Sequence, residues 1–114
     1  MVKKKDIKKR LIDANRVFGG TLVNKSNLDF ELEMIKNQDK HLRKAAHITR
    51  AMTSGHAFSD GNKRTAIVGV TSEFYNADLK ADKKKLVKTM INLSKTGEGS
   101  IIKIERKLRR CTRK

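Results

Sequence analysis

The sequence contains little cysteine and few aromatic residues. Its only cysteine, Cys111, cannot form an intramolecular disulfide, and a cysteine-based zinc site is excluded. This cysteine usage fits a reducing compartment, so we expect a cytoplasmic protein. Aromatic residues make up 4% of the chain, so the core must be mainly aliphatic. That composition favours packed helices over an aromatic-rich β sandwich.

Long apolar runs are also missing. No stretch of about 18 apolar residues could span a bilayer, and the first residues lack the apolar segment of a secretory signal. We therefore expect no membrane partner.

Two common phosphate-binding signatures are absent. A Walker A loop needs Gly-x-x-x-x-Gly-Lys-Ser/Thr, whereas Gly55 and Gly61 are separated by five residues and followed by Asn62. The His-Arg-Asp and Asp-Phe-Gly segments of protein kinases do not occur either. Ordinary P-loop and kinase folds are thereby excluded.

Negative charge is scarce. The chain has 28 Lys and Arg against 12 Asp and Glu, a formal charge of +16. Such a field favours polyanionic partners, among which RNA, ribosomes, nucleotides and an acidic protein all fit. A solvated lysine-rich surface explains the same composition equally well.

The length of 114 residues predicts a single domain over residues 1–114. Apolar residues recur at helical spacing in several stretches. The pattern predicts helices marked by Ile7 to Phe18, Leu42 to Met52, residues 62–75, Leu86 to Ile91, and Ile101 to Cys111. Gly19-Gly20, Ser54-Gly55, Asn76-Ala77-Asp78 and Thr96 to Gly99 end the first four of these.

The stretch from Leu28 to Met34 is ambiguous. It alternates apolar and acidic residues with a period of two, which is typical of a strand. Ser26 or Asn27 could equally cap a short helix there. The sequence does not decide between the two.

The most informative segment is His-Ala-Phe-Ser-Asp-Gly-Asn-Lys-Arg, residues 56–64. A polar turn follows Phe58, and an apolar rhythm resumes after Lys63, so the turn opens into a helix. A phosphate placed there would meet free backbone N–H groups and the positive end of the helix dipole. Lys63 and Arg64 oppose that dipole in the first turn, a conflict that a bound anion would relieve.

This segment closely resembles the Fic/Doc signature, His-x-Phe-x-(Asp or Glu)-Gly-Asn. More narrowly it is similar to the death-on-curing (Doc) branch, which continues Lys-Arg-Thr-Ala, as residues 63–66 do here. Residues 16–20 and 96–98 are similar to an aromatic-Gly-Gly stretch and a turn of Doc proteins. The resemblance implies an all-α fold, a compact Fic-type bundle of five or six helices with room for a short β hairpin or flap.

The resemblance also implies roles for the motif residues. His56 would be the general base that deprotonates a target hydroxyl, which suits the titration range of histidine. Asp60 would hold Mg²⁺ against the phosphates of ATP, although an Asp at a helix start can also be a simple cap. The other expected roles are phosphate or nucleotide binding by Gly61, Asn62, Lys63 and Arg64, and a structural anchor for Phe58.

The two remaining histidines, His41 and His47, are expected to be structural. Their spacing of six residues does not form a His-x-x-x-His metal pair, so zinc is not expected.

Two positions depart from the adenylyltransferases of the Fic family. Those enzymes usually have Gly where this chain has Lys63 and a second Arg where it has Ile67. The resemblance thus implies a Doc-like toxin that transfers the terminal phosphate of ATP to a Ser or Thr hydroxyl, on a target expected to be a Tu-type translation elongation factor. The alternative on the same fold is AMP transfer.

Control and partners follow from the same resemblance. Residues 94–99 satisfy the string of the Fic inhibitory helix, Ser/Thr-x-x-x-Glu-Gly/Asn, but Gly97 and Gly99 make a poor helix. We therefore expect a separate antitoxin with a disordered tail. An alternative outside enzymes is a nucleic-acid- or ribosome-binding module with a degenerate active site. It would bind through the basic residues Lys103, Arg106, Lys107, Arg109 and Arg110.

Overall fold

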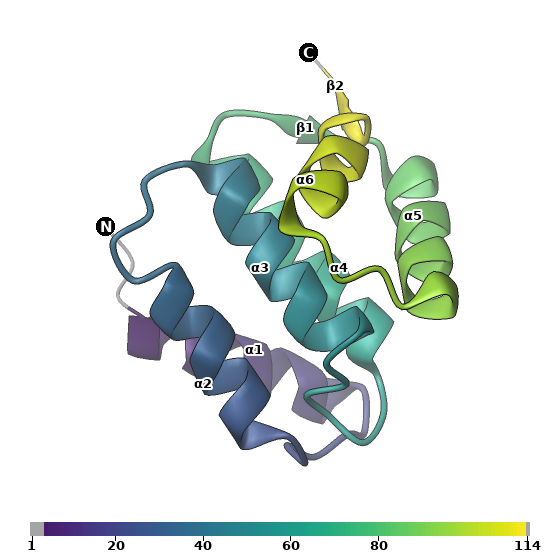
Figure 1. Cartoon of the computed structure of the whole chain (residues 1–114). Helices are drawn as coiled ribbons and strands as arrows, with labels where there is room; N and C mark the ends of the chain where they lie inside the picture. Colours follow the sequence, from purple (N-terminus) through teal and green to yellow (C-terminus); the bar gives the residue numbers. More distant parts are fainter. Residues whose placement is uncertain (1–3, 114) are drawn as a thin grey trace.

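The computed structural model describes residues 4–113 of the chain, which form six helices and two short strands (Figure 1). The all-α prediction is confirmed. The helices are α1 (Lys4–Val17), α2 (Lys25–Met34), α3 (His41–Thr53), α4 (Asn62–Asn76), α5 (Lys83–Thr96) and α6 (Ile101–Arg109). None of these helices is long and apolar enough to cross a bilayer.

The short β element joins distant parts of the chain. Strand β1 (Lys80–Ala81) pairs antiparallel with β2 (Thr112–Arg113), with Lys80 opposite Arg113. Helices α5 and α6 lie between the two strands in the sequence. Cys111, just before β2, is buried, so the last described residues pack onto the bundle.

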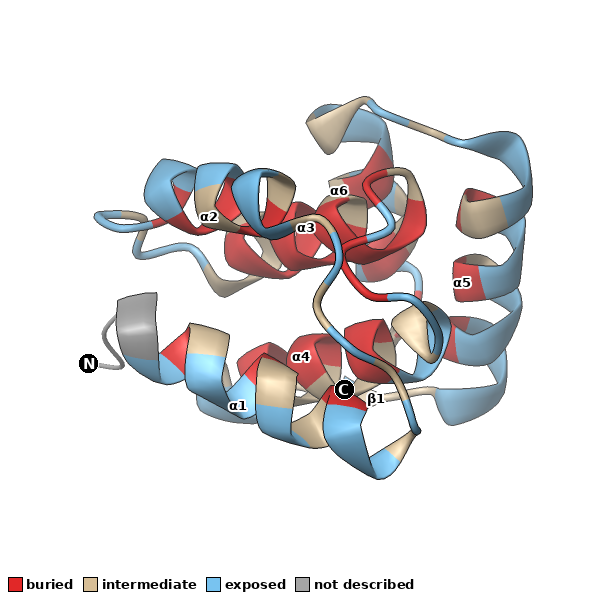
Figure 2. Ribbon diagram, turned by 90° about the horizontal axis from the view of Figure 1, so that it is seen from below, coloured by how far each residue is buried: buried red, intermediate tan, exposed pale blue. Residues whose placement is uncertain are grey.

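Helices α3 and α4 form the centre of the bundle, with α1 and α2 on one side and α5 and α6 on the other (Figure 1). Their facing surfaces are the most buried part of the molecule (Figure 2). Small residues allow the close approach. A Cβ added at Gly69 of α4 would lie 2.7 Å from Cγ2 of Ile48 on α3, so only glycine fits at this contact.

The ambiguous stretch is the helix α2, so the strand alternative is wrong. The cap is Asn24, whose Oδ1 accepts a hydrogen bond from the backbone N–H of Asn27; neither Ser26 nor Asn27 is the N-cap. The alternating pattern does not match burial, because Phe30 is 56% exposed whereas its neighbour Glu31 is buried.

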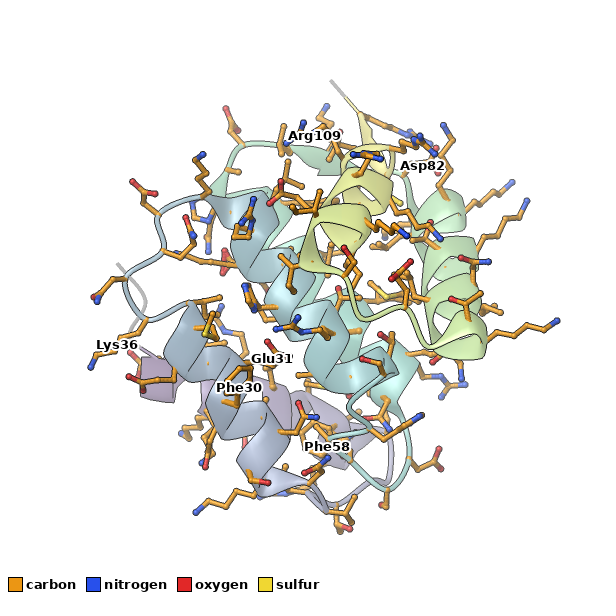
Figure 3. The ribbon with its side chains drawn as sticks, in the orientation of Figure 1. Phe30, Glu31, Lys36, Phe58, Asp82 and Arg109 are labelled. Atoms are coloured by element: carbon orange, nitrogen blue, oxygen red, sulfur yellow. The ribbon has the colours of Figure 1, made fainter. Side chains whose placement is uncertain are left out.

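Glu31 is buried because α3 supplies its partners (Figure 3). Its Oε1 contacts Nδ1 of His47 at 2.8 Å, and its Oε2 accepts from Nε of Arg50 at 2.6 Å. Burial raises the pKa of Glu31, but hydrogen bonds and charge from His47 and Arg50 outweigh that effect, so the pKa lies below its ordinary value. His41 contacts Glu73 at 2.7 Å. Both histidines therefore make structural contacts, as expected.

Helix α5 ends before the acidic residue of the string expected in an inhibitory helix. Gly97 caps the helix with a φ of 67°, and Glu98 accepts a hydrogen bond from the backbone N–H of Ser100. Residues 94–99 therefore do not form one continuous helix, which agrees with the expectation from Gly97 and Gly99.

Candidate functional site

The motif loop, residues 54–61 between α3 and α4, lies against the link between α1 and α2. Leu22 forms an antiparallel bridge with Phe58, and Val23 donates its N–H to the carbonyl of Ala57 at 2.9 Å. Ser59 donates its N–H to the carbonyl of Thr21 at 2.8 Å. The ring of Phe58 is buried, as a structural anchor requires. The loop is therefore fixed along its backbone on one side.

Asn62 closes the turn on the other side. Its Oδ1 accepts from the backbone N–H of Phe58 at 3.0 Å, and its Nδ2 donates to the carbonyl of Phe58 at 2.7 Å. Both ends of the amide are thus engaged within the loop. Any contact of Asn62 with a phosphate would use its backbone N–H.

Helix α4 begins immediately after Gly61, which has a φ of 72° and makes no side-chain cap. The backbone N–H groups of residues 62–64 have no hydrogen-bond partner within residues 4–113. These are the donors that a helix N-terminus offers to an anion.

Two cations stand beside these donors. Lys63 and Arg64 are exposed on the first turn of α4, which carries no acidic residue. The Arg64 guanidinium lies 5.9 Å from the centroid of the Phe18 ring, close enough for a cation–π contact. Together with Phe18, residues 60–64 line a cavity of about 240 Å³. The helix terminus and its cations therefore face a recess that can hold an anionic group.

Asp60 contributes a carboxylate to the same cavity. Its Oδ1 accepts from the adjacent N–H of Gly61 at 2.8 Å. It makes no capping bond to the first turn of α4, so the simple capping explanation of this residue does not describe the structure.

Asn15 binds the backbone of Asp60, a contact that the sequence analysis did not predict. Fully buried at the end of α1, it donates from Nδ2 to the carbonyl of Asp60 at 2.7 Å and to Oγ1 of Thr65 at 3.1 Å. Thr65 in turn donates to the carbonyl of Gly61 at 2.8 Å. A signal was present, because Asn15 follows Leu11 by four residues and so places a polar side chain on the apolar face of α1.

The backbone at this point is too crowded for most other residues. A Cβ added at Gly20 would collide with Oδ1 of Asn15 and with the carbonyl of Asp60. The Gly19-Gly20 pair, expected to end a helix, thus also lets the link after α1 pass directly beside the motif loop.

His56 occupies a strained backbone position. Its φ of 45° lies in the left-handed region, which few residues other than glycine adopt. The side chain is exposed and has no hydrogen-bond partner in the part of the chain that the structure describes. It is not among the residues that line the cavity. Strain of this kind is often found at functional positions, and the ring is free to meet a substrate that approaches from solvent.

A model of the Fic/DOC family matches residues 5–71, which include the motif loop and the first part of α4. The match covers more than half of the chain. The chain belongs to the Fic/DOC family. No curated protein and no solved structure matches it.

Fic/DOC proteins generally transfer a nucleotide monophosphate or a phosphate to other proteins, using ATP and typically Mg²⁺. The residues of this chain fit both ATP and Mg²⁺. Among the described residues there is no cluster of three His, Cys, Asp or Glu that could hold a metal alone. Mg²⁺ commonly takes one carboxylate together with phosphate oxygens and waters, and Asp60 offers that carboxylate in the lining of the cavity.

Proposed function

We propose that this Fic/DOC protein is a Doc-like toxin that transfers the terminal phosphate of ATP to a Ser or Thr hydroxyl of a protein. The observation that supports this choice best is Lys63 on the first turn of α4. It adds a positive charge beside three N–H groups that have no partner among residues 4–113, and Ile67 occupies the position where the adenylyltransferases have a second Arg. A terminal phosphate, which carries the most negative charge of a nucleotide, fits this position best.

The residues of the motif loop and of the first turn of α4 have separate roles in this proposal. The exposed ring of His56 takes the proton of the target hydroxyl, whose oxygen forms a bond to the terminal phosphorus while the bond to the next phosphate breaks and ADP leaves. The N–H groups of residues 62–64, with Lys63 and Arg64, hold and neutralise the phosphate oxygens. Mg²⁺ held by Asp60 would balance the charge of the phosphate chain.

The partners in this proposal come from the resemblance to Doc toxins. The target is a translation elongation factor of the Tu type, and the toxin is paired with an antitoxin. An acidic, initially disordered antitoxin segment would suit a chain of charge +16.

AMP transfer is the second candidate, because the family includes both activities. The two reactions differ in which phosphorus reaches the target. Purified protein is therefore incubated with a cell extract and ATP labelled at the alpha or the gamma phosphate. We expect gamma label, and no alpha label, on one protein of the extract. Alpha label on the target would show that Lys63 does not set the orientation of the nucleotide and would replace the first candidate with the second.

Two substitutions at His56 test whether this residue is the base of the transfer reaction. His56→Asn removes the base and retains a residue that tolerates positive φ, so it should lower transfer on the order of 10²-fold or more with little change in melting temperature. His56→Ala should lower transfer equally. Near wild-type transfer by either variant would contradict the role of His56.

Lys63→Gly should reduce phosphate transfer sharply. Its control is Lys84→Gly, which makes the same change at the second residue of α5 and so accounts for the loss of helix propensity. Equal loss in both variants would mean that Lys63 acts only on helix stability.

A further inference from the structure

Much of the positive charge of the chain lies in its last third. Residues 80–114 contain thirteen Lys or Arg against three Asp or Glu, a net charge of +10 out of +16. The family match ends at residue 71. The helices of this region, α5 and α6, pack on the side of α3 and α4 away from α1 and α2 (Figure 1).

Four of these cations line one recess between the two helices. Lys85 and Lys88 come from α5, and Lys107 and Arg110 come from α6 and its cap, around a hollow of about 370 Å³. We call this hollow the α5–α6 recess. Within residues 4–113 none of the four makes an ion pair. Lys107 donates to Oδ1 of Asn92 at 2.9 Å, a neutral partner.

The carboxylates of this region are few, and each has a partner outside the four recess side chains. Asp82 caps α5 and lies 4.0 Å from Arg113. Glu105 pairs with Arg43 at 2.6 Å. Glu98, as described above, accepts from Ser100. One carboxylate near four cations leaves the α5–α6 recess with a net positive charge.

The placement of these cations costs stability. Helix α5 begins with three lysines, residues 83–85, and has no acidic residue in its first turn. Cations at a helix N-terminus oppose the dipole. Lys85 and Lys88 are also three residues apart on one helix face, where like charges repel. A dispersed solvated surface would avoid both costs, whereas a polyanion seated in the recess would offset them.

The large exposed apolar side chains of α5 and α6 do not line the recess. An amphipathic helix needs apolar contacts beside its charges, and α5 does expose Val87 and Ile91. Neither of these two side chains is among the residues that line the recess. Ile102, exposed on α6, does not line it either. The α5–α6 recess is thus lined by four cations together with Thr89, Asn92 and Cys111, a charge that favours a phosphate backbone as its occupant.

We propose that the α5–α6 recess binds the phosphate backbone of a nucleic-acid duplex, separately from the active site. No aromatic residue lines it, so it lacks the stacking platform that single strands usually require. The recess is lined by the first part of α5 and the end of α6, the ends next to β1 and β2, and the motif loop lies at the other end of α4 (Figure 1). With a rise of 1.5 Å per residue, the helix separates the two by roughly 20 Å.

The test is fluorescence anisotropy of the full chain with labelled RNA and DNA duplexes of roughly 20 base pairs, over about 50 to 200 mM salt. The double variant Lys88→Gln with Arg110→Gln should weaken binding at least tenfold. It should also reduce the slope of log affinity against log salt by about 1.8, the value for two phosphate contacts. The two duplexes should bind within a few fold of each other.

The control removes the same charge from α1. Lys9 and Arg10 are exposed and make no ion pair with any described residue, so replacing both by Gln should change affinity less than threefold. Lys85→Gln with Arg110→Gln is a second recess variant in case the first melts early.

Three results would overturn the proposal. The first is equal loss in the recess and control variants, which would indicate a diffuse field. The second is tighter binding of a single strand than of either duplex. The third is equal binding of a polyglutamate peptide of matched charge, which would point to an acidic protein partner.

Discussion

Replacing Asn15 tests whether the motif loop depends on a residue outside the motif. Asn15→Ala removes the bonds from Nδ2 to the carbonyl of Asp60 and to Oγ1 of Thr65. Thr65 retains its own bond to Gly61, but the carbonyl of Asp60 loses the one side-chain donor that residues 4–113 give it. A net hydrogen bond contributes about 1 kcal/mol, and a buried group left without a partner costs about 1–3 kcal/mol.

We therefore expect a loss of about 2 kcal/mol in the free energy of unfolding, which corresponds to a fall of ~8 °C in melting temperature for a domain of this size. Urea unfolding followed by circular dichroism measures the free energy. The control is Asn37→Ala, since Asn37 is exposed and makes no hydrogen bond among residues 4–113; it should change stability by less than about 0.5 kcal/mol.

Asn15→Asp separates the loss of the donor from the loss of volume. It keeps the size of the side chain but places an acceptor against the carbonyl of Asp60, so at neutral pH it should destabilise at least as much as Asn15→Ala. Its deficit should shrink in acid, because protonation restores a donor. Wild-type stability of Asn15→Asp at neutral pH would refute the assignment of these bonds.

Two further predictions concern other parts of the fold. The pKa of Glu31 lies below its ordinary value in the folded protein, so the stability it contributes should be present above about pH 4.5 and be lost as the pH falls through the lowered pKa. Glu31→Gln should flatten the unfolding free energy between about pH 5 and 3, while the exposed Glu33→Gln should not; parallel curves for wild type and Glu31→Gln would contradict this. Gly61→Ala should lose about 1–2 kcal/mol from left-handed strain alone, and more from a Cβ placed 2.8 Å from that of Phe18; urea unfolding at wild-type stability would show that the turn can change conformation.

The sequence predicts the motif loop and five helices because these depend on local spacing. It fails at α2 because burial there is set by partners elsewhere in the chain: Glu31 is buried by two side chains of α3, while Phe30 stays exposed. Asn15 was missed for a similar reason, since its contacts lie 45 and 50 residues away. Local patterns indicate helices and their ends, but not which polar side chain pairs across the core.

The bonds that hold the motif loop on both sides have a consequence for binding. With Val23 bonded to Ala57, Ser59 bonded to Thr21 and Asn62 closed onto Phe58, the backbone around His56 has little conformational freedom left to lose. Ordering a loose loop would reduce the affinity for a ligand, because its conformational entropy must be given up on association. Here the loop is already ordered by folding, so a nucleotide loses less binding free energy to ordering the loop around its phosphates.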